Sequence, residues 1–127
     1  MCYNTDRFCG GMAPMRRVAC VGLAILGSVA MAAAAPVLPD RPNEVTFPPT
    51  EARFLRFLIH ESAGGQPCLD ELEVYGPEGG ANLALAGAGA KASASSCLPG
   101  YAIHQVAHLN DGLYGNSHSW IAASAAE

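Results

Sequence analysis

The most regular pattern of hydrophobic and polar positions runs from residue 52 to residue 76. Residues 52–60 mix aromatic and β-branched side chains with basic ones, ARFLRFLIH, a composition that favours a β-strand. Residues 62–67 follow with two glycines and a proline, which interrupt regular structure. In residues 69–75 apolar side chains alternate loosely with acids, LDELEVY, as on a strand with one solvated face. This stretch therefore predicts two strands joined by a loop.

The second half of the chain predicts shorter elements. In residues 82–96, NLALAGAGAKASASS, two alternating segments flank a Gly-Ala-Gly sequence. We interpret them as two short strands, and a flexible linker is the alternative. Residues 101–109, YAIHQVAHL, carry apolar side chains at helical spacing and predict one or two helical turns. Turn-forming residues fill positions 110–119, and Trp120-Ile121 predicts the start of another strand.

The first 35 residues form a different kind of segment. Arg16 and Arg17 precede the apolar run Val18–Ala30, and small residues follow it, which is the pattern of a secretory signal peptide. The sequence predicts cleavage after Ala34 and an exported chain, secreted, periplasmic or held at the cell surface. The apolar run is broken by glycines and is short for a membrane span, so no stable span is expected after cleavage. A retained N-terminal anchor is the alternative.

Residues 36–51 contain five prolines. Proline at this density disfavours both helix and strand pairing, so the segment is expected to be an extended lead-in. The predicted organisation thus has three parts: an N-terminal extension with signal peptide (1–35), a proline-rich lead-in (36–51) and a partial β-domain (52–127). About 90 exported residues allow one small domain at most.

Charge and cysteine usage narrow the class of protein. The chain has 7 basic and 11 acidic residues and a formal net charge of -4, and it lacks the basic runs of a nucleic-acid binder. Of its 5 cysteines, Cys68 and Cys97 lie outside the predicted signal segment. In an oxidising compartment these two are candidates for a disulfide. Two separate buried thiols are the alternative, and the sequence leaves both open.

Two histidines suggest a zinc site that the neighbouring residues do not support. His104 and His108 are four positions apart, which on a helix places both side chains on one face. The catalytic version of this pair requires a glutamate directly after the first histidine, and the chain has Gln105 there. A structural zinc site would need two further ligands. We therefore expect these histidines to lie at the surface or to be partly packed.

The acids of the second predicted strand do not form a convincing catalytic pair. Glu71 and Glu73 would lie on one strand face, roughly 7 Å apart, between the separations typical of retaining and inverting glycosidases. Asp70, Glu71 and Glu73 are expected to be solvated, as acids on an exposed strand edge usually are. The sequence contains no recognisable nucleophile–base pair or phosphate loop, so we expect a non-catalytic protein.

A loop rich in oxygen donors is the better candidate site. Asn110-Asp111-Gly112, with Asn116-Ser117 close behind, offers the oxygen ligands that a hard cation such as Ca²⁺ requires. Local oxygens are too few for its full coordination, so a carboxylate from elsewhere is needed, with Glu71 or Glu73 as the expected donor. The alternative is an Asx-turn, in which the aspartate bonds its own backbone.

Two segments of the chain resemble the discoidin domain, the coagulation factor 5/8 type C module. Residues 82–120 resemble its opening, with NLAL, then ASASS, then Asp111-Gly112 leading to Trp120. Residues 52–76 resemble its end, with ARFLRF followed by ELEVYG. The order is the reverse of the family's, which indicates a permuted domain or the tail of one module joined to the head of the next. The family's middle strands are missing, so the chain looks truncated.

The resemblance implies an all-β, jelly-roll β-sandwich of the galactose-binding-like type, incomplete in this chain. It implies a structural calcium site whose ligands are the side chains of Glu71 and Asp111, the carbonyls of His108 and Leu113, and an oxygen of Asn116 or Ser117. It also implies an exported, non-catalytic module of a larger protein that recognises carbohydrate or another cell-surface ligand. An accessory domain of a secreted hydrolase and a truncated, non-functional fragment are the alternatives. Trp120 is expected in the core rather than at a sugar-binding surface.

Overall fold

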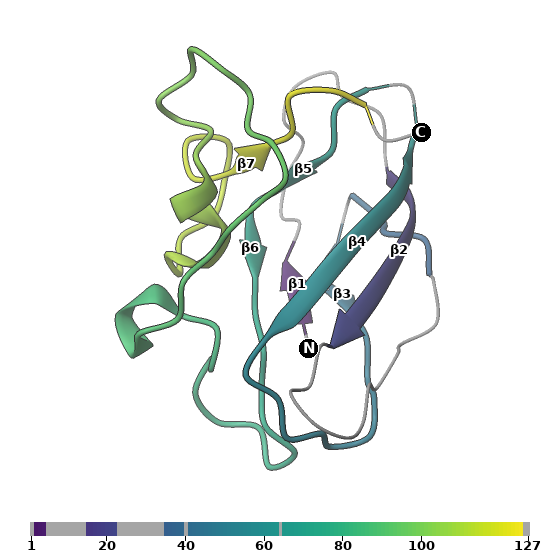
Figure 1. Ribbon diagram of the computed structural model, residues 1–127, viewed down its shortest axis with the longest axis vertical. Coiled ribbons are helices and arrows are strands. Elements are labelled where there is room, and N and C mark those ends of the chain that lie inside the picture. Colours follow the sequence, from purple (N-terminus) through teal and green to yellow (C-terminus); the bar gives the residue numbers. More distant parts are fainter. Residues whose placement is uncertain (1, 5–14, 23–34, 40, 64, 126–127) are drawn as a thin grey trace.

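The fold is strand-dominated, and Figure 1 shows it as a computed structural model that describes residues 2–4, 15–22, 35–39, 41–63 and 65–125. Within these ranges there is no α-helix, and the elements in order are β1 (Cys2–Asn4), β2 (Met15–Gly22), β3 (Asn43–Glu44), β4 (Leu55–Ser62), β5 (Cys68–Leu69), β6 (Glu71–Leu72), the 3₁₀ turns η1 (Ala86–Ala88) and η2 (Val106–Asn110), and β7 (Trp120–Ile121). The mostly-β class expected from the sequence is therefore confirmed.

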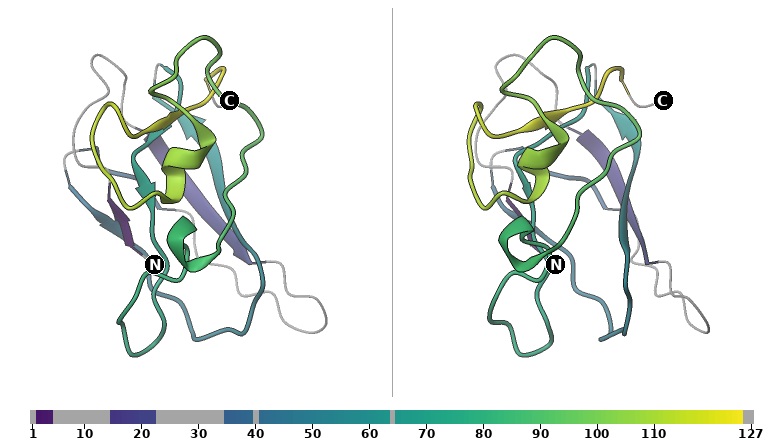
Figure 2. Two further views of the ribbon diagram at one scale, coloured as in Figure 1. Left: turned by 90° about the vertical axis from the view of Figure 1, so that its left-hand side faces the viewer. Right: turned by 60° about the vertical axis from the view of Figure 1, so that its left-hand side comes forward.

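The strands form three small antiparallel sheets. Their orders are β3–β1–β6, β2–β4 and β5–β7. Figures 1 and 2 show the two 3₁₀ turns on one side of the molecule, with β2 and β4 on the other. Strand β4 confirms the first predicted strand, although it begins at Leu55 rather than at residue 52. Strand β7 confirms the strand predicted at Trp120.

Strand β2 comes from the segment in which the sequence predicts a signal peptide. Its backbone pairs with β4 from Met15 opposite Ser62 to Gly22 opposite Leu55. Cleavage after Ala34 would remove β1 and β2 and leave β4 without this partner. The predicted cleavage would therefore change the fold. Much of the apolar run lies outside the described residues. No helix in the described part of the chain is long and apolar enough to cross a membrane.

The second predicted strand is divided in two. Asp70 forms a bend between β5, which pairs with β7, and β6, which pairs with β1. Asp70 is only 3% exposed and Glu71 is fully buried, so the prediction that these acids are solvated was wrong. The reason is that both carboxylates accept backbone N–H groups from a loop distant in sequence, Gly115 for Asp70 and Gly112 for Glu71.

Residues 82–96 form no strand, contrary to the prediction. Two asparagine side chains take the place of a neighbouring strand in binding the backbone. The Asn82 Oδ1 accepts the N–H groups of Val74 (3.0 Å) and Ala84 (2.9 Å), and the Asn110 Nδ2 donates to the Ala84 carbonyl at 2.8 Å. The segment contains only the short turn η1. These bonds attach it to the rest of the domain, so it is not a free linker.

The helical turns predicted over residues 101–109 are present as the shorter element η2. The preceding residues form a separate turn, in which the Gln105 Nε2 donates to the Tyr101 carbonyl at 2.7 Å. Leu109 is buried, as expected of the apolar stripe, whereas Ile103 is 43% exposed because it precedes the helical turn.

The core gathers side chains from distant parts of the chain: Val37, Leu69, Leu109, Trp120 and Ala122. Trp120 is 6% exposed, and its indole N–H donates to the Ser96 carbonyl at 2.8 Å. The placement of Trp120 in the core is therefore confirmed. The burial of Val37 means that the proline-rich lead-in packs against the domain. The expectation that this segment pairs with no strand was wrong, because β3 lies within it and pairs with β1.

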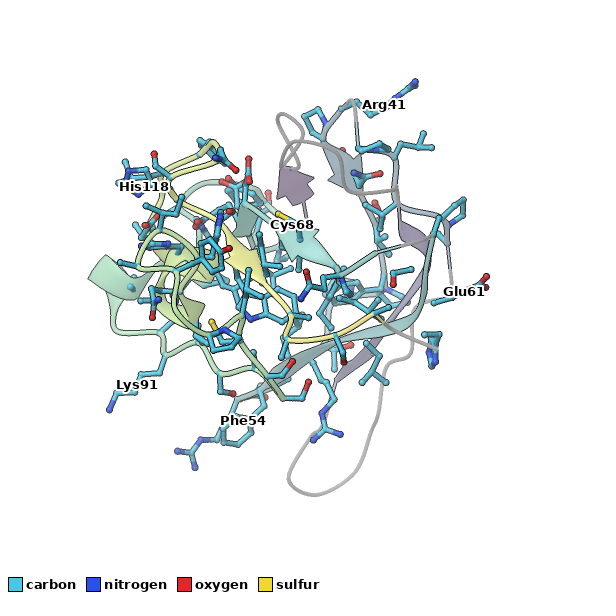
Figure 3. The ribbon with its side chains drawn as sticks, turned by 90° about the horizontal axis from the view of Figure 1, so that it is seen from above. Arg41, Phe54, Glu61, Cys68, Lys91 and His118 are labelled. Carbon is cyan, nitrogen blue, oxygen red and sulfur yellow. The ribbon has the colours of Figure 1, made fainter. Side chains whose placement is uncertain are left out.

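The Cys68–Cys97 disulfide, one of the two arrangements that the sequence left open, is not formed. Cys97 is a free thiol whose Sγ donates to the His104 carbonyl at 3.0 Å. Cys68, in β5 (Figure 3), is disulfide-bonded, so the alternative of two separate thiols was wrong as well.

We expect a reducing agent to lower the Tm of the protein by acting at Cys68. A native disulfide contributes about 2–4 kcal/mol to the free energy of unfolding, whereas Cys97 makes only one weak hydrogen bond through its thiol. In thermal melts with and without reductant, Cys97→Ser should therefore remain sensitive to reduction, and Cys68→Ser should not. A Cys97→Ser variant that no longer responds to reductant would contradict this assignment.

Candidate metal site

Three carboxylate contacts join the segment around β6 to the loop after η2. The contacts are those of the Asp70 Oδ2 with the Gly115 N–H (3.1 Å), the Glu71 Oε1 with the Gly112 N–H (3.1 Å) and the Glu73 Oε1 with the Tyr114 hydroxyl (2.9 Å). These segments are about forty residues apart in sequence. The acids thus lie against the oxygen-rich loop that the sequence singles out.

The loop owes its shape to glycines and to one aspartate. Gly112 and Gly115 have φ angles of 79° and 101°, in the left-handed region that favours glycine. The Asp111 Oδ1 accepts the Leu113 N–H at 2.8 Å, which is an Asx-turn. The Asx-turn considered as an alternative to a metal ligand is therefore present. It uses one carboxylate oxygen of Asp111 and directs the following N–H, that of Gly112, to Glu71.

Glu71 is the most unusual residue of the site. Its side chain is fully buried, and its Oε2 has no hydrogen-bond partner within the described part of the protein. Burial raises the pKa of Glu71 from 4.5 to about 7, and repulsion by Asp111 and Glu73 raises it further against the lowering effect of the Gly112 N–H. A buried carboxylate oxygen without a partner is destabilising, and a bound cation would remove this penalty.

The other predicted ligands are placed less centrally. Leu113 is 49% exposed, and Asn116 and Ser117 are exposed as well. The Asn116 carbonyl accepts the Ser119 hydroxyl at 3.4 Å. The structure therefore brings Glu71 to the Asp111-Gly112 turn, whereas Leu113, Asn116 and Ser117 are exposed. Two carboxylates at one turn suit Ca²⁺, which completes its six to eight ligands with carbonyls and water.

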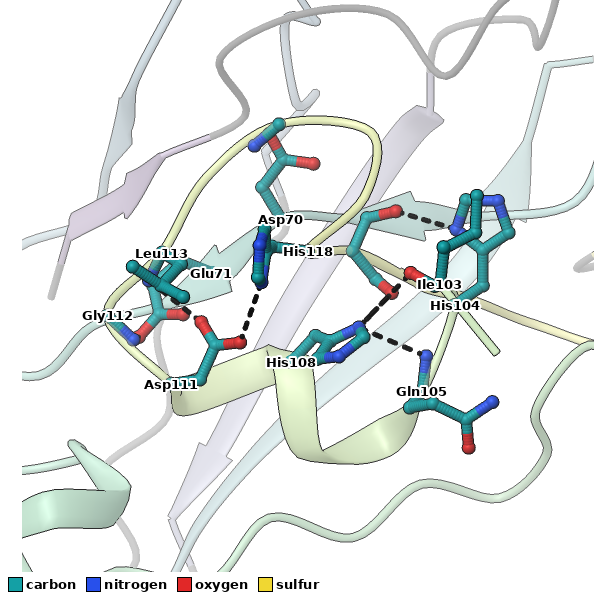
Figure 4. A network of polar contacts seen from close by, with 12 residues as sticks. Asp70, Glu71, Ile103, His104, Gln105, His108, Asp111, Gly112, Leu113 and His118 are labelled. Atoms are coloured by element: carbon teal, nitrogen blue, oxygen red, sulfur yellow. Dashed lines mark hydrogen bonds and ion pairs between the residues drawn. The ribbon is translucent and has the colours of Figure 1, made fainter. Parts of the chain in front are cut away.

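A second group of side chains shares Asp111 and was missed by sequence reasoning. His108, Asp111 and His118 each offer a ligand atom, and these atoms all lie within 4.8 Å of one another. The His118 Nδ1 is 3.3 Å from the Asp111 Oδ2, and the rings of His108 and His118 are 5.5 Å apart between centroids (Figure 4).

His104 is only 6% exposed, so the expectation that it lies at the surface or is partly packed was wrong, whereas His108 is half-buried as expected. A 3₁₀ turn has three residues per turn, so side chains at i and i+3 lie together, and His108 lies near Asp111. The His104 Nδ1 lies 2.9 Å from the Ser119 hydroxyl in a buried position. Burial lowers the pKa of His104, and His108 lowers it further. His104 is therefore a structural residue, and His118 carries no periodic signal that the sequence could have revealed.

We expect the calcium-free protein to lose stability as the pH rises from about 4.5 to about 7. In this range folded Glu71 holds a proton that the unfolded chain releases, so the free energy of unfolding falls with pH. The loss is on the order of 3 kcal/mol. Glu71→Gln has no such proton, so urea melts of the two proteins in EDTA should converge at low pH and diverge by pH 8. If the difference in the free energy of unfolding between wild type and Glu71→Gln does not change with pH, the raised pKa of Glu71 is contradicted.

No protein family, no characterised protein and no solved structure matches the chain.

Proposed function

We propose that this chain is an exported, non-catalytic binding module of the discoidin type, with a jelly-roll arrangement of its strands and a structural calcium ion. Its ligand is a carbohydrate or another cell-surface group. The observation that carries the proposal is the buried Glu71 carboxylate, whose unpaired oxygen lies beside the Asp111 turn.

The residues of the site fit a calcium ion by their chemistry. Asp111 is close enough for its charge to raise the pKa of Glu71, so the two carboxylates repel each other in the absence of a cation. Ca²⁺ would supply the neutralising charge and accept oxygen ligands in irregular geometry. Glu71 comes from β6 and Asp111 from the end of η2, so joint coordination would fasten the two segments together and hold the loop in one conformation.

The same loop presents groups that suit a carbohydrate. Tyr114 is 41% exposed, and its hydroxyl donates to the Glu73 Oε1 at 2.9 Å. The Tyr75 hydroxyl donates to the same oxygen at 3.0 Å. An exposed ring beside a carboxylate combines an apolar face with hydrogen-bond acceptors. The first suits the apolar face of a sugar ring and the second its hydroxyl groups. Trp120 cannot serve as this platform because it is buried.

Thermal melts of the full chain in CaCl₂, MgCl₂ and EDTA test the calcium part of the proposal. We expect one cooperative transition that calcium shifts upward and that magnesium shifts less, because Mg²⁺ requires a strict octahedron. The absence of a calcium shift would overturn the site. The ligand is tested on immobilised glycans, where Tyr114→Ala should lose retention and Tyr101→Ala, which removes another exposed tyrosine, should keep it. Equal retention of both variants would overturn the proposed surface.

A further inference from the structure

The structure assigns a second metal site, for a divalent transition-metal ion such as Zn²⁺, to His108, Asp111 and His118. We propose that the two imidazoles and the Asp111 Oδ2 bind this ion at the surface of the loop after η2. The three ligand atoms already lie within 4.8 Å of one another. The site goes beyond the proposed calcium site, which rests on Glu71 and uses oxygen ligands only.

The spacing of the ligand atoms matches a tetrahedral ion. Zinc binds histidine nitrogen and carboxylate oxygen at about 2.0–2.1 Å, so two ligands of a tetrahedral ion lie about 3.3–3.4 Å apart. The His118 Nδ1 and the Asp111 Oδ2 are 3.3 Å apart. The other atom pairs of the group, at up to 4.8 Å, need only a small inward movement of side chains. Imidazole nitrogen favours zinc and its neighbours in the transition series over calcium.

The orientation of His108 is fixed by its backbone neighbours. Its Nδ1 lies 3.1 Å from the Ile103 carbonyl and 3.3 Å from the Ser119 carbonyl. Two carbonyl acceptors require a proton on Nδ1, and they lie closer than the Gln105 N–H at 3.4 Å, which would require the opposite tautomer. The Nε2 then carries the lone pair that a metal needs. Donation of the second ring N–H to a carbonyl is the usual support of a metal-binding histidine.

The group is accessible to an ion from solvent. The side chains of His118 and Asp111 are 38% and 23% exposed, and Figure 3 shows His118 at the edge of the molecule. The ligands come from η2 and from the loop that follows it, and η2 packs on the core through the buried Leu109. A site with three protein ligands leaves the fourth position of a tetrahedral ion to water.

Titration of the EDTA-treated full chain with Zn²⁺ by calorimetry, and with Co²⁺ by visible absorption, tests this site. We expect one ion per chain and a Co²⁺ spectrum typical of tetrahedral coordination. His118→Ala and His108→Ala should each weaken zinc binding at least about tenfold. His60→Ala, which removes an exposed histidine of β4, should leave it unchanged. Absence of binding, or equal affinity in the His118 and His60 variants, would overturn the site and leave only a His118–Asp111 ion pair.

The two metal sites can be separated because each has a residue of its own. Glu71→Gln should abolish the calcium effect and keep zinc binding, whereas His118→Ala should keep the calcium effect and lose zinc. A retained calcium shift in His118→Ala also shows that this variant is folded. If Glu71→Gln loses zinc to the same degree as His118→Ala, there is one site rather than two, and the assignment of a separate zinc site is wrong.

Discussion

Replacing Glu71 with glutamine is expected to abolish the calcium-induced rise in Tm while leaving the calcium-free protein folded. Glutamine keeps an oxygen for the Gly112 N–H and removes the charge that repels Asp111 and Glu73. In wild type, a calcium concentration of about 100 times Kd adds about 2.7 kcal/mol to the free energy of unfolding. This gain should fall to zero in the variant, as measured by thermal melts in calcium and in EDTA.

The neighbouring acids provide the controls for the Glu71 variant. Asp111→Asn should lose the calcium shift as well, because Asp111 is the second carboxylate of the site. Glu73→Gln should keep most of it, because the Glu73 Oε1 is already occupied by the hydroxyls of Tyr75 and Tyr114. If Glu71→Gln and Asp111→Asn both retain the full shift, calcium binds elsewhere.

Replacing Trp120 with alanine is expected to reduce the free energy of unfolding by about 3–5 kcal/mol. The indole is 6% exposed and packs with Val37, Leu69 and Leu109, so its removal leaves a cavity. The Ser96 carbonyl also loses its partner. Small domains have about 5–15 kcal/mol of stability in total, so the variant should be largely unfolded at modest urea concentrations. Because Trp120 is the only tryptophan, circular dichroism rather than fluorescence measures the transition.

An exposed aromatic residue gives the matched comparison for Trp120. Phe54 is 56% exposed, and Phe54→Ala should change the free energy of unfolding by less than about 1 kcal/mol. A Trp120→Ala protein that keeps its stability but no longer binds glycans would mean that the indole serves recognition and not the core.

The parts of the fold that sequence reasoning predicted are those set by local composition. Strands β4 and β7 lie where β-branched and aromatic residues concentrate, and η2 lies where apolar residues recur at helical spacing. On chemical grounds either Glu71 or Glu73 was expected at the Asp111 turn, since a cation at that loop needs a carboxylate from a distant segment, and Glu71 is the one that binds the Gly112 N–H. The strand and turn predictions needed no knowledge of long-range packing.

The predictions that were wrong concern segments that depend on single long-range contacts, which no local sequence pattern indicates. Alternation in residues 82–96 suggested strands, but the amide of Asn110, distant in sequence, binds the backbone there. Asp70 and Glu71 were expected in solvent because an alternating strand was assumed. The bend at Asp70 removes that alternation and turns both acids inward.

The surroundings of the histidines and cysteines also depend on backbone geometry that the sequence does not reveal. A four-residue spacing joins side chains only on an α-helix, and the 3₁₀ geometry of η2 joins His108 to Asp111 instead. Cys68 and Cys97 were the two cysteines left outside the predicted signal segment, but the Cys97 thiol is bonded to the His104 carbonyl beside η2. Composition therefore indicated which residue types matter, and the backbone geometry decided which of them meet.

The most direct test of the calcium site is the anomalous scattering of crystals of the full chain grown in calcium. The account predicts one calcium peak coordinated by the Glu71 Oε2 and by Asp111, with oxygen ligands at about 2.3–2.6 Å. A calcium ion bound without Glu71, or a Glu71 whose second oxygen is paired by protein or water alone, would contradict it.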